Sequence, residues 1–212
     1  MSMVEPKHSG WAVWGNAELL GRLAVGICGA RDADEQAIEL SERFGRLMAE
    51  VGLVVISGNA RGVDDAAQFG GLDAGGSVIS VLAEGLADWN PRLRYRPLIN
   101  DLNYAAVSEF EADAGWQAWR AMQRNGTILD LARALVVVQS GTSGGTWNAG
   151  LEALRRGTPL LVVQRQSKPE TEGNAHLIAR GGIPVNTVKA LKTLLEAIRD
   201  GDTLPNGQQT LL

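Results

Sequence analysis

The stretch VVVQSGTSGGTWNAGLEALRRG, residues 136–157, decides the fold that the sequence predicts. Its three valines indicate a short buried strand, a loop rich in glycine and hydroxyl side chains follows, and the remainder has the residue types of a helix. A strand that passes through a glycine loop into a helix is the repeating unit of a parallel sheet. Such a loop is either a tight turn or a cradle for a phosphate, and the neighbouring segments must separate the two interpretations.

The same unit recurs along the chain. Continuous apolar runs alternate with segments of helical character, and they span residues 23–30, 53–57, 78–85, 105–110, 135–140, 160–165 and, more briefly, 183–185. Apolar runs without alternation indicate strands that are buried on both faces. We therefore predict an α/β fold, a doubly wound, extended Rossmann-like domain whose mostly parallel sheet carries helices on both faces.

A single domain accounts for most of the 212 residues. We expect a lead-in over residues 1–20, the Rossmann-type domain over residues 21–200 and a polar, flexible tail over residues 201–212. The segment WQAWRAMQRNGTILDLARA predicts a helix with a break at Asn125–Gly126. Cys28 lies inside an apolar run and is expected to be buried as a small hydrophobic residue.

Composition limits the functions that the chain can have. A net charge of −4 argues against a protein that coats nucleic acid indiscriminately, although it allows a local basic groove. No segment approaches the roughly 18 apolar residues of a membrane span, so we expect a cytoplasmic protein without membrane contact. The two histidines, His8 and His176, form no cluster with the cysteine, and no Ser/His/Asp pattern stands out. The sequence therefore predicts no metal, no cofactor and no catalytic residue.

Three glycine-bearing loops follow predicted strands, at residues 29–34, 57–64 and 140–146. In an open parallel sheet all three lie at the carboxyl edge, where ligands bind. Arg31 and Arg61 fall inside two of these loops and could hold a phosphate. The loops lack both the dinucleotide fingerprint and the lysine of a P-loop, so ATPase and dehydrogenase functions are disfavoured. We predict a shared anion or nucleotide crevice.

In order, the segments VGICGARDAD, VISGNARGVDDAAQFGGLDAGG, VSEF, RNGTI, VVVQSGTSGGTWNAGLEALRRGTPLLVV and EGNAHLIARGG resemble one family. They are similar to the Rossmann-like core of the DNA-processing protein A family (DprA, also called Smf). The resemblance covers about Trp11 to Pro184. One departure is Gln68, where members of the family commonly carry histidine.

The resemblance implies a homodimer that binds single-stranded DNA, hands the strand to the RecA recombinase and catalyses no turnover. It makes Arg61 the best candidate for a contact with a DNA phosphate and puts Arg124 and Asn125 on an arginine–asparagine pair beside the site. The full set of candidate DNA or phosphate-binding residues is Arg31, Ser57, Gly58, Arg61, Gly62, Arg124, Asn125, Ser140, Gly141, Ser143, Gly144 and Thr146.

Single strands are held by a positive groove and by aromatic side chains on which bases stack. Beyond the residues above, Arg92, Arg94 and Arg96 add charge near the predicted edge. Three aromatic side chains are candidates for stacking, namely Trp89, Tyr95 and Trp147. Trp116 and Trp119 are expected to pack in the core instead.

Two alternatives remain open. Related Rossmann-like domains are thought to sense nucleotide-derived signals, so the ligand could be a free nucleotide. The cytokinin-activating phosphoribohydrolases carry the loop P-G-G-x-G-T-x-x-E, which in this chain has Gly141 in place of the proline and Ala149 in place of the catalytic glutamate. An enzyme of that type is therefore the weaker alternative.

Overall fold

The computed structural model describes residues 10–166 and 168–205. Its central feature is a sheet of eight strands in the order β1-β5-β4-β3-β2-β6-β7-β8. Every neighbouring pair runs parallel except β1 and β5. The strands are β1 (Ala12–Gly15), β2 (Ala24–Cys28), β3 (Val54–Ser57), β4 (Val78–Val81), β5 (Tyr104–Ser108), β6 (Ala132–Val137), β7 (Leu160–Val163) and β8 (Ile183–Val185).

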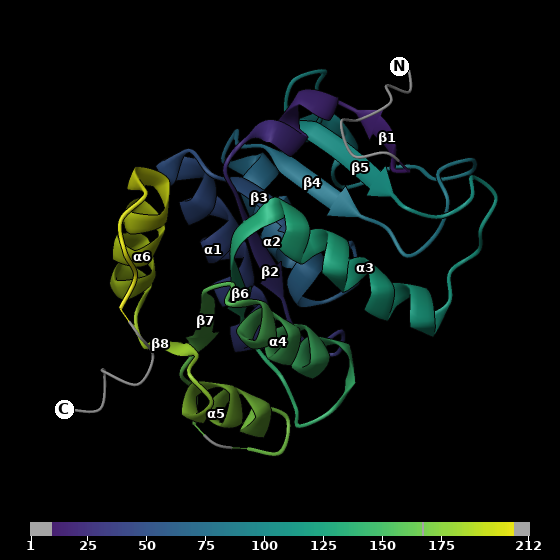
Figure 1. Cartoon of the computed structure of the whole chain (residues 1–212). Coiled ribbons are helices and arrows are strands. Elements are labelled where there is room, and N and C mark those ends of the chain that lie inside the picture. Colours follow the sequence, from purple (N-terminus) through teal and green to yellow (C-terminus); the bar gives the residue numbers. More distant parts are fainter. Residues whose placement is uncertain (1–9, 167, 206–212) are drawn as a thin grey trace.

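Helices cover both faces of the sheet (Figure 1). They are α1 (Glu35–Val51), α2 (Val63–Asp73), α3 (Ala118–Leu131), α4 (Gly144–Arg156), α5 (Glu172–Ala179) and α6 (Val188–Asp200). Helices α1, α2 and α6 pack on one face, and α3, α4 and α5 pack on the other. The prediction of a doubly wound α/β sheet is confirmed.

Two separate hydrophobic layers form because successive residues of a strand point to opposite faces. In β2, Val25 and Ile27 enter the layer under α1 and α2, whereas Ala24 enters the layer under α3 and α4. A strand that serves both layers must be apolar at consecutive positions, which explains the continuous apolar runs in the sequence.

Helices α1 and α2 approach each other closely because glycines stand where they meet. A Cβ atom at Gly45 would collide with the carbonyl oxygen of Ala67, and one at Gly70 would collide with that of Glu42. This contact fixes α2, and with it the loop that precedes α2, relative to the sheet.

The structure changes three details of the predicted organisation. Residues 12–15 of the expected lead-in form β1, which pairs antiparallel with β5, while residues 1–9 lie outside the described residues. Helix α3 runs without a break through Asn125–Gly126, because the side of α3 around Thr127 and Ile128 is packed against the sheet. Leu204 of the expected tail packs on the core, and residues 206–212 lie outside the described residues.

Candidate functional site

The order of the strands creates one topological switch point. From β2 the chain builds outward through β3, β4 and β5, and it then returns to the other side of β2 for β6, β7 and β8. The loops that follow β2 and β6 therefore diverge from adjacent strands, and open sheets of this kind bind ligands at such a point. Two joined hollows lie there, with volumes of about 460 and 240 Å³. Both are lined by Arg31, Ala60, Trp116 and Arg124, and we call them together the arginine crevice.

Most of the predicted site residues line the arginine crevice: Arg31, Gly58, Arg61, Arg124, Asn125, Ser140, Gly141, Ser143, Gly144 and Thr146. Ser57 and Gly62 do not line it. Ser57 is buried beneath it and accepts a hydrogen bond of 2.7 Å from the amide of Gln68. Gly62 has a φ of 82°, and a Cβ atom there would collide with the backbone carbonyl groups of Ala30 and Arg31, so this glycine lets the loops after β2 and β3 meet.

Arg124 forms the floor of the crevice. Only 6% of the residue is exposed, and its guanidinium lies against Gly58, where any side chain would overlap it. Among the described residues its ion-pair partner is Asp64, with 3.9 Å between Nη2 and Oδ2, and its Nε has no hydrogen-bond partner there. A buried cation with so few partners is costly unless an anion completes it.

Asp64 and Arg124 influence each other's ionisation. Burial lowers the pKa of Arg124, and the charge of Asp64 opposes that shift. Burial raises the pKa of Asp64, against the charge of Arg124 and the backbone N–H groups of Ala60 and Gly58, which donate to its Oδ2 at 3.3 and 3.1 Å. The backbone donors hold the carboxylate beneath the loop, so it offsets part of the Arg124 charge from below.

Arg31 and Arg61 supply charge at the mouth of the crevice. The side chain of Arg61 is 68% exposed, and its one ion pair, at 2.8 Å, is with the exposed Asp32. The guanidinium of Arg31 lies over the ring of Trp116, 5.0 Å from its centroid. Trp116 is 50% exposed, and Trp119 is exposed to a similar extent. The expectation that these two tryptophans belong to the core was wrong, because about half of each residue is exposed to solvent.

The aromatic side chains expected to stack have other positions. Tyr95 is fully buried, and its hydroxyl donates to the backbone carbonyl of Asp65 at 3.1 Å, so it cannot receive a base. Trp89 packs edge-on against Trp14, 5.4 Å between ring centroids. Trp147 lies on α4 beside His176 and outside the crevice.

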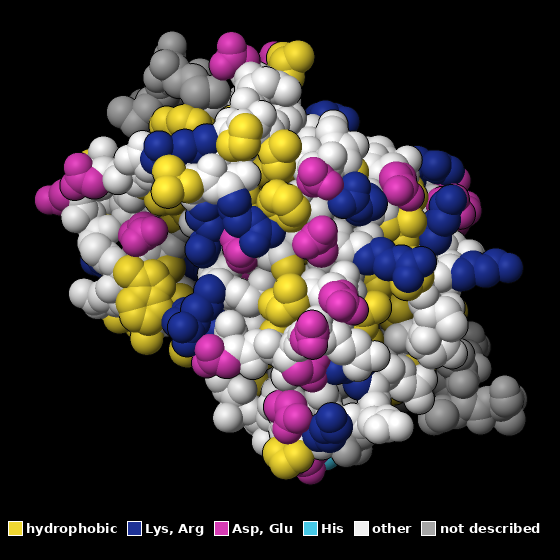
Figure 2. All heavy atoms as spheres, turned by 180° about the vertical axis from the view of Figure 1, so that it is seen from behind, with side chains coloured by type: hydrophobic (Ala, Val, Ile, Leu, Met, Phe, Trp, Pro, Cys, Tyr) yellow, Lys and Arg dark blue, Asp and Glu magenta, His cyan; other side chains and the backbone are white. Residues whose placement is uncertain are grey.

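The three arginines expected to add charge near the edge form contacts within the protein. Arg92 and Arg94 both pair with the carboxylate of Asp65, at 3.2 and 3.1 Å. Arg96 donates to the backbone carbonyl of Pro91 at 3.3 Å. Seen from behind, Lys and Arg side chains gather beside hydrophobic ones on part of the surface, whereas both charges are interspersed over the rest (Figure 2). On this face positive charge is therefore concentrated locally, although the net charge of the chain is −4.

The loop after β6 is held by a residue that the sequence reasoning missed. Asn174 of α5 is buried, and its Oδ1 accepts from the backbone N–H of Ser140 at 2.8 Å. Its amide nitrogen donates to the carbonyl oxygens of Val138 and Val163, at 2.9 and 2.8 Å. Asn174 thereby ties the ends of β6 and β7 to α5. An asparagine between apolar residues of a short helix was the signal that could have revealed it.

The carboxylates near the crevice differ in position from the phosphoribohydrolase motif. Ala149 stands in it where a phosphoribohydrolase has its glutamate. Glu152, one turn further along α4, points to Arg155 and Arg156, whose hydrogen bonds lower its pKa to about 2. Within the described part of the chain, no group of three or more His, Cys, Asp or Glu residues could hold a metal ion. No helix of that part is long and apolar enough to cross a membrane.

Comparison with known proteins decides the family. The model of the family described as DNA recombination-mediator protein A matches residues 10–197. The chain belongs to this family. The predicted resemblance to DprA and Smf is thereby confirmed.

Individual relatives support the same family assignment. It is 33% identical over 151 residues to Protein Smf of Escherichia coli, an alignment that covers 68% of this chain and 40% of that protein. The DNA processing protein DprA of Bacillus subtilis is 26% identical over 160 residues, 74% of this chain and 54% of that protein. The chain thus spans about half the length of the curated relatives that it matches.

Solved structures of DNA processing proteins have a fold similar to that of this chain. DNA processing protein A from Streptococcus pneumoniae superposes with a TM-score of 0.76 at 25% identity, covering 86% of this chain and 65% of that one. The protein of the same name from Helicobacter pylori, whose structure concerns its single-stranded DNA binding mode, gives a TM-score of 0.79 at 20% identity and covers 95% and 97%.

Proposed function

We propose that this chain binds single-stranded DNA in the arginine crevice and acts in DNA processing or recombination. The observation that carries the proposal is the buried Arg124, under-bonded at the floor, with Arg31 and Arg61 at the mouth. A phosphate entering the crevice would meet positive charge on more than one side, and arginine guanidinium groups suit phosphate oxygens.

The exposed Trp116 favours a strand over an isolated phosphate. Its ring borders both hollows and is partly covered by Arg31, so a base could stack beside a phosphate held in the crevice. Single-strand binding proteins combine these two features, a positive groove and an aromatic face. Membership of the recombination-mediator family and the single-strand binding of the Helicobacter pylori protein support the same proposal.

A free nucleotide is the second candidate ligand, because a crevice at a switch point that holds one phosphate can hold a mononucleotide as well. The test uses a fluorescent oligonucleotide, a duplex of the same sequence and a panel of mononucleotides at low salt. We expect the single strand to bind and the mononucleotides to compete only weakly. Absence of oligonucleotide binding at low salt would contradict the proposal, and thermal stabilisation by a mononucleotide at micromolar concentration would favour the second candidate.

Arg31→Ala is the variant that tests the crevice in the same assay. Loss of Arg31 removes a charge and leaves Trp116 uncovered, so affinity for the single strand should fall. Arg43→Ala is the matched control, because Arg43 is exposed on α1 and lines neither hollow. Equal affinities of the two variants would contradict a role of the crevice.

We also propose that the chain acts without catalysis. The carboxylates that line the crevice within the described residues are Asp64, which is buried against Arg124, and Glu84. Release of free base from nucleoside monophosphates would contradict this. A cytoplasmic location, a homodimer and a handover of the strand to RecA are further proposals, which family membership supports. Sedimentation analysis and a RecA loading assay test the last two.

A further inference from the structure

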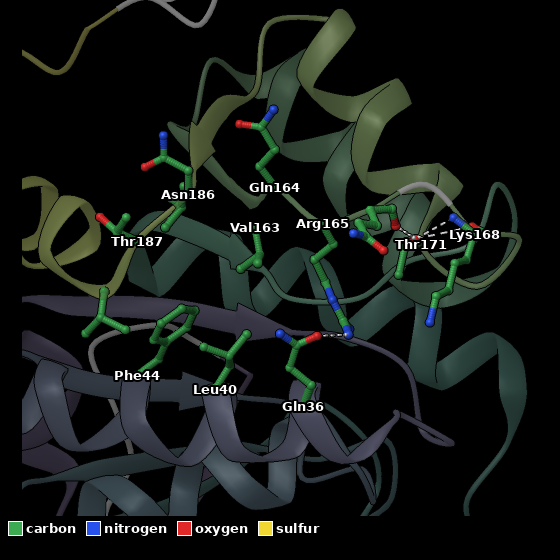
Figure 3. A pocket seen from close by; sticks show the side chains of 13 residues that line it. Gln36, Leu40, Phe44, Val163, Gln164, Arg165, Lys168, Thr171, Asn186 and Thr187 are labelled. Carbon is green, nitrogen blue, oxygen red and sulfur yellow. Dashed lines mark hydrogen bonds between the residues drawn. The ribbon is translucent and has the colours of Figure 1, made fainter.

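A second cavity, of about 470 Å³, lies at the carboxyl edge of the sheet, beyond the arginine crevice (Figure 3). It is formed between the first half of α1, the ends of β7 and β8 and the start of α6. Its volume falls within the range of small-ligand sites. The proposed function does not use it.

Apolar side chains line opposite sides of this cavity. Leu40 and Phe44 rise from α1, and Val163 of β7 faces them across the gap (Figure 3). Val185 of β8 and Val188 of α6 continue the apolar lining. Phe44, Val163 and Val185 are at most 5% exposed and form the floor of the cavity, so a flat ring that enters would contact mainly the partly buried Leu40 and Val188.

The rim of the cavity carries amide side chains. Gln164 and Asn186 are exposed there, and within the described residues their side-chain amides form no hydrogen bond. An amide both donates and accepts, as does the edge of a nucleobase, and asparagine or glutamine pairs best with adenine. The rim can therefore form hydrogen bonds with the edge of a ring that lies against the apolar lining.

The charge available to a ligand is that of Lys168. Arg165 also lines the cavity, but its Nη2 donates to both carboxylate oxygens of Asp34 at 2.8 Å and to Gln36 Oε1 at 2.9 Å. The carboxylate of Asp34 thus offsets the charge of the Arg165 guanidinium, and this side chain forms part of the cavity wall. Lys168 is exposed at the rim and forms no ion pair within the described residues; its charge acts on Asp34 from a distance, and its ammonium group can bind an anion such as a phosphate.

The cavity adjoins the arginine crevice. Gln139 lines the crevice, and its Oε1 accepts a hydrogen bond of 3.1 Å from Nη1 of Arg165. The two sites are therefore separated by one pair of side chains, and β6 and β7 are adjacent strands, about 5 Å apart. A chain of nucleotides held by one site can reach the other.

We propose that this cavity is a second nucleotide site, which holds a nucleobase, adenine in preference, against its apolar lining and the attached phosphate at Lys168. The nucleotide can belong to the strand in the crevice or be free. In its strand form the inference rests on the proposed function, whereas in its free form it is independent of it.

The test compares variants of the full chain with 2′-deoxyadenosine monophosphate and with short oligo(dA) and oligo(dT). Asn186→Trp fills the cavity from an exposed position, and Lys168→Ala removes its free charge without adding bulk. The matched controls are Asn148→Trp and Lys192→Ala, both at exposed positions that line neither site. Melting temperature reports the mononucleotide, and fluorescence anisotropy reports the oligonucleotides.

If the nucleotide is free, the monophosphate raises the melting temperature of the wild type and of Arg61→Ala but not that of Asn186→Trp. If it belongs to the strand, Asn186→Trp and Lys168→Ala bind oligo(dA) about tenfold more weakly than the wild type, while the controls do not change. The inference is overturned if both cavity variants match the wild type with every ligand, or if the wild type binds none of them. If Arg61→Ala binds oligonucleotides with the affinity of the wild type while both cavity variants bind them more weakly, the crevice proposal fails and the cavity proposal stands.

Discussion

Replacing Arg61 by alanine isolates a single contact of the proposed DNA site. The side chain is 68% exposed, and its partner Asp32 is exposed as well, with 2.8 Å between Nη2 and Oδ1. An ion pair in such a position contributes little to folding, so the free energy of unfolding should change by less than about 0.5 kcal/mol. Any effect on DNA is then an effect on binding.

The magnitude follows from the release of counterions. One phosphate contact on a single strand contributes about 0.7 to the slope of log K against log salt concentration, so Arg61→Ala should flatten that slope by about 0.7. Between 50 and 200 mM salt the logarithm changes by about 0.6, so the advantage of the wild type over the variant should shrink about 2.6-fold over that range.

The assay is fluorescence anisotropy with a labelled oligonucleotide at four salt concentrations. Arg43→Ala is the control, because it makes the same change of charge at an exposed position of α1 outside the crevice. An Arg61→Ala slope equal to that of the wild type would refute the assignment of a phosphate contact. An equal flattening in Arg43→Ala would show that net charge, and not the crevice, determines the salt dependence.

Four further predictions follow from the site. Trp116→Ala should weaken single-strand binding by about 1–3 kcal/mol, and Trp116→Phe should restore most of it if stacking is the cause, as measured by anisotropy. Gly58→Ala should abolish binding and destabilise the fold by about 1–3 kcal/mol in denaturant titrations, because its Cβ overlaps the Arg124 guanidinium. Arg124→Met should cost about 3–5 kcal/mol by leaving the Asp64 carboxylate buried and unpaired, and addition of Asp64→Asn should recover part of that loss; no recovery would contradict the pairing. Burial acts to raise the pKa of Asp34, but the hydrogen bond from the Arg165 side chain lowers the pKa overall. The ionised carboxylate therefore stabilises the fold above the unfolded pKa of about 3.9, and this stabilisation is lost as pH falls through the lowered folded value. Asp34→Asn should be less stable than the wild type at pH 7, and the difference in their free energies of unfolding should disappear in acid.

The strands and the edge that carries the site could be predicted from the chain itself. A strand inside a doubly covered sheet has no polar face, so its continuous apolar run marks it directly. Parallel strands bring their following loops to one edge, which is why Arg31, Arg61 and the glycine loop at residues 140–146 could be grouped before the structure was known.

The short first strand, β1, could not be predicted from its local sequence. Residues 12–15 form only four positions of β1, at the edge of the sheet, and they depend on pairing with β5, more than 90 residues away in the sequence. Nothing in the local pattern distinguishes such a segment from an extended lead-in, because its hydrogen bonds come from a distant partner.

The division of the aromatic and charged side chains was decided by tertiary structure alone. Tyr95 and Trp116 both lie in irregular segments, yet Tyr95 is buried in the hydrophobic layer that includes α2 whereas Trp116 is 50% exposed. Arg124 has the sequence context of an exposed helical arginine, but α3 turns it inward under Gly58, against Asp64. The sequence determined which residues reach the carboxyl edge, since continuous apolar runs mark the parallel strands and the loops that follow such strands lie at one edge. Which of them are exposed to a ligand depended on the packing of segments far apart in the chain, and local sequence does not encode burial of that kind.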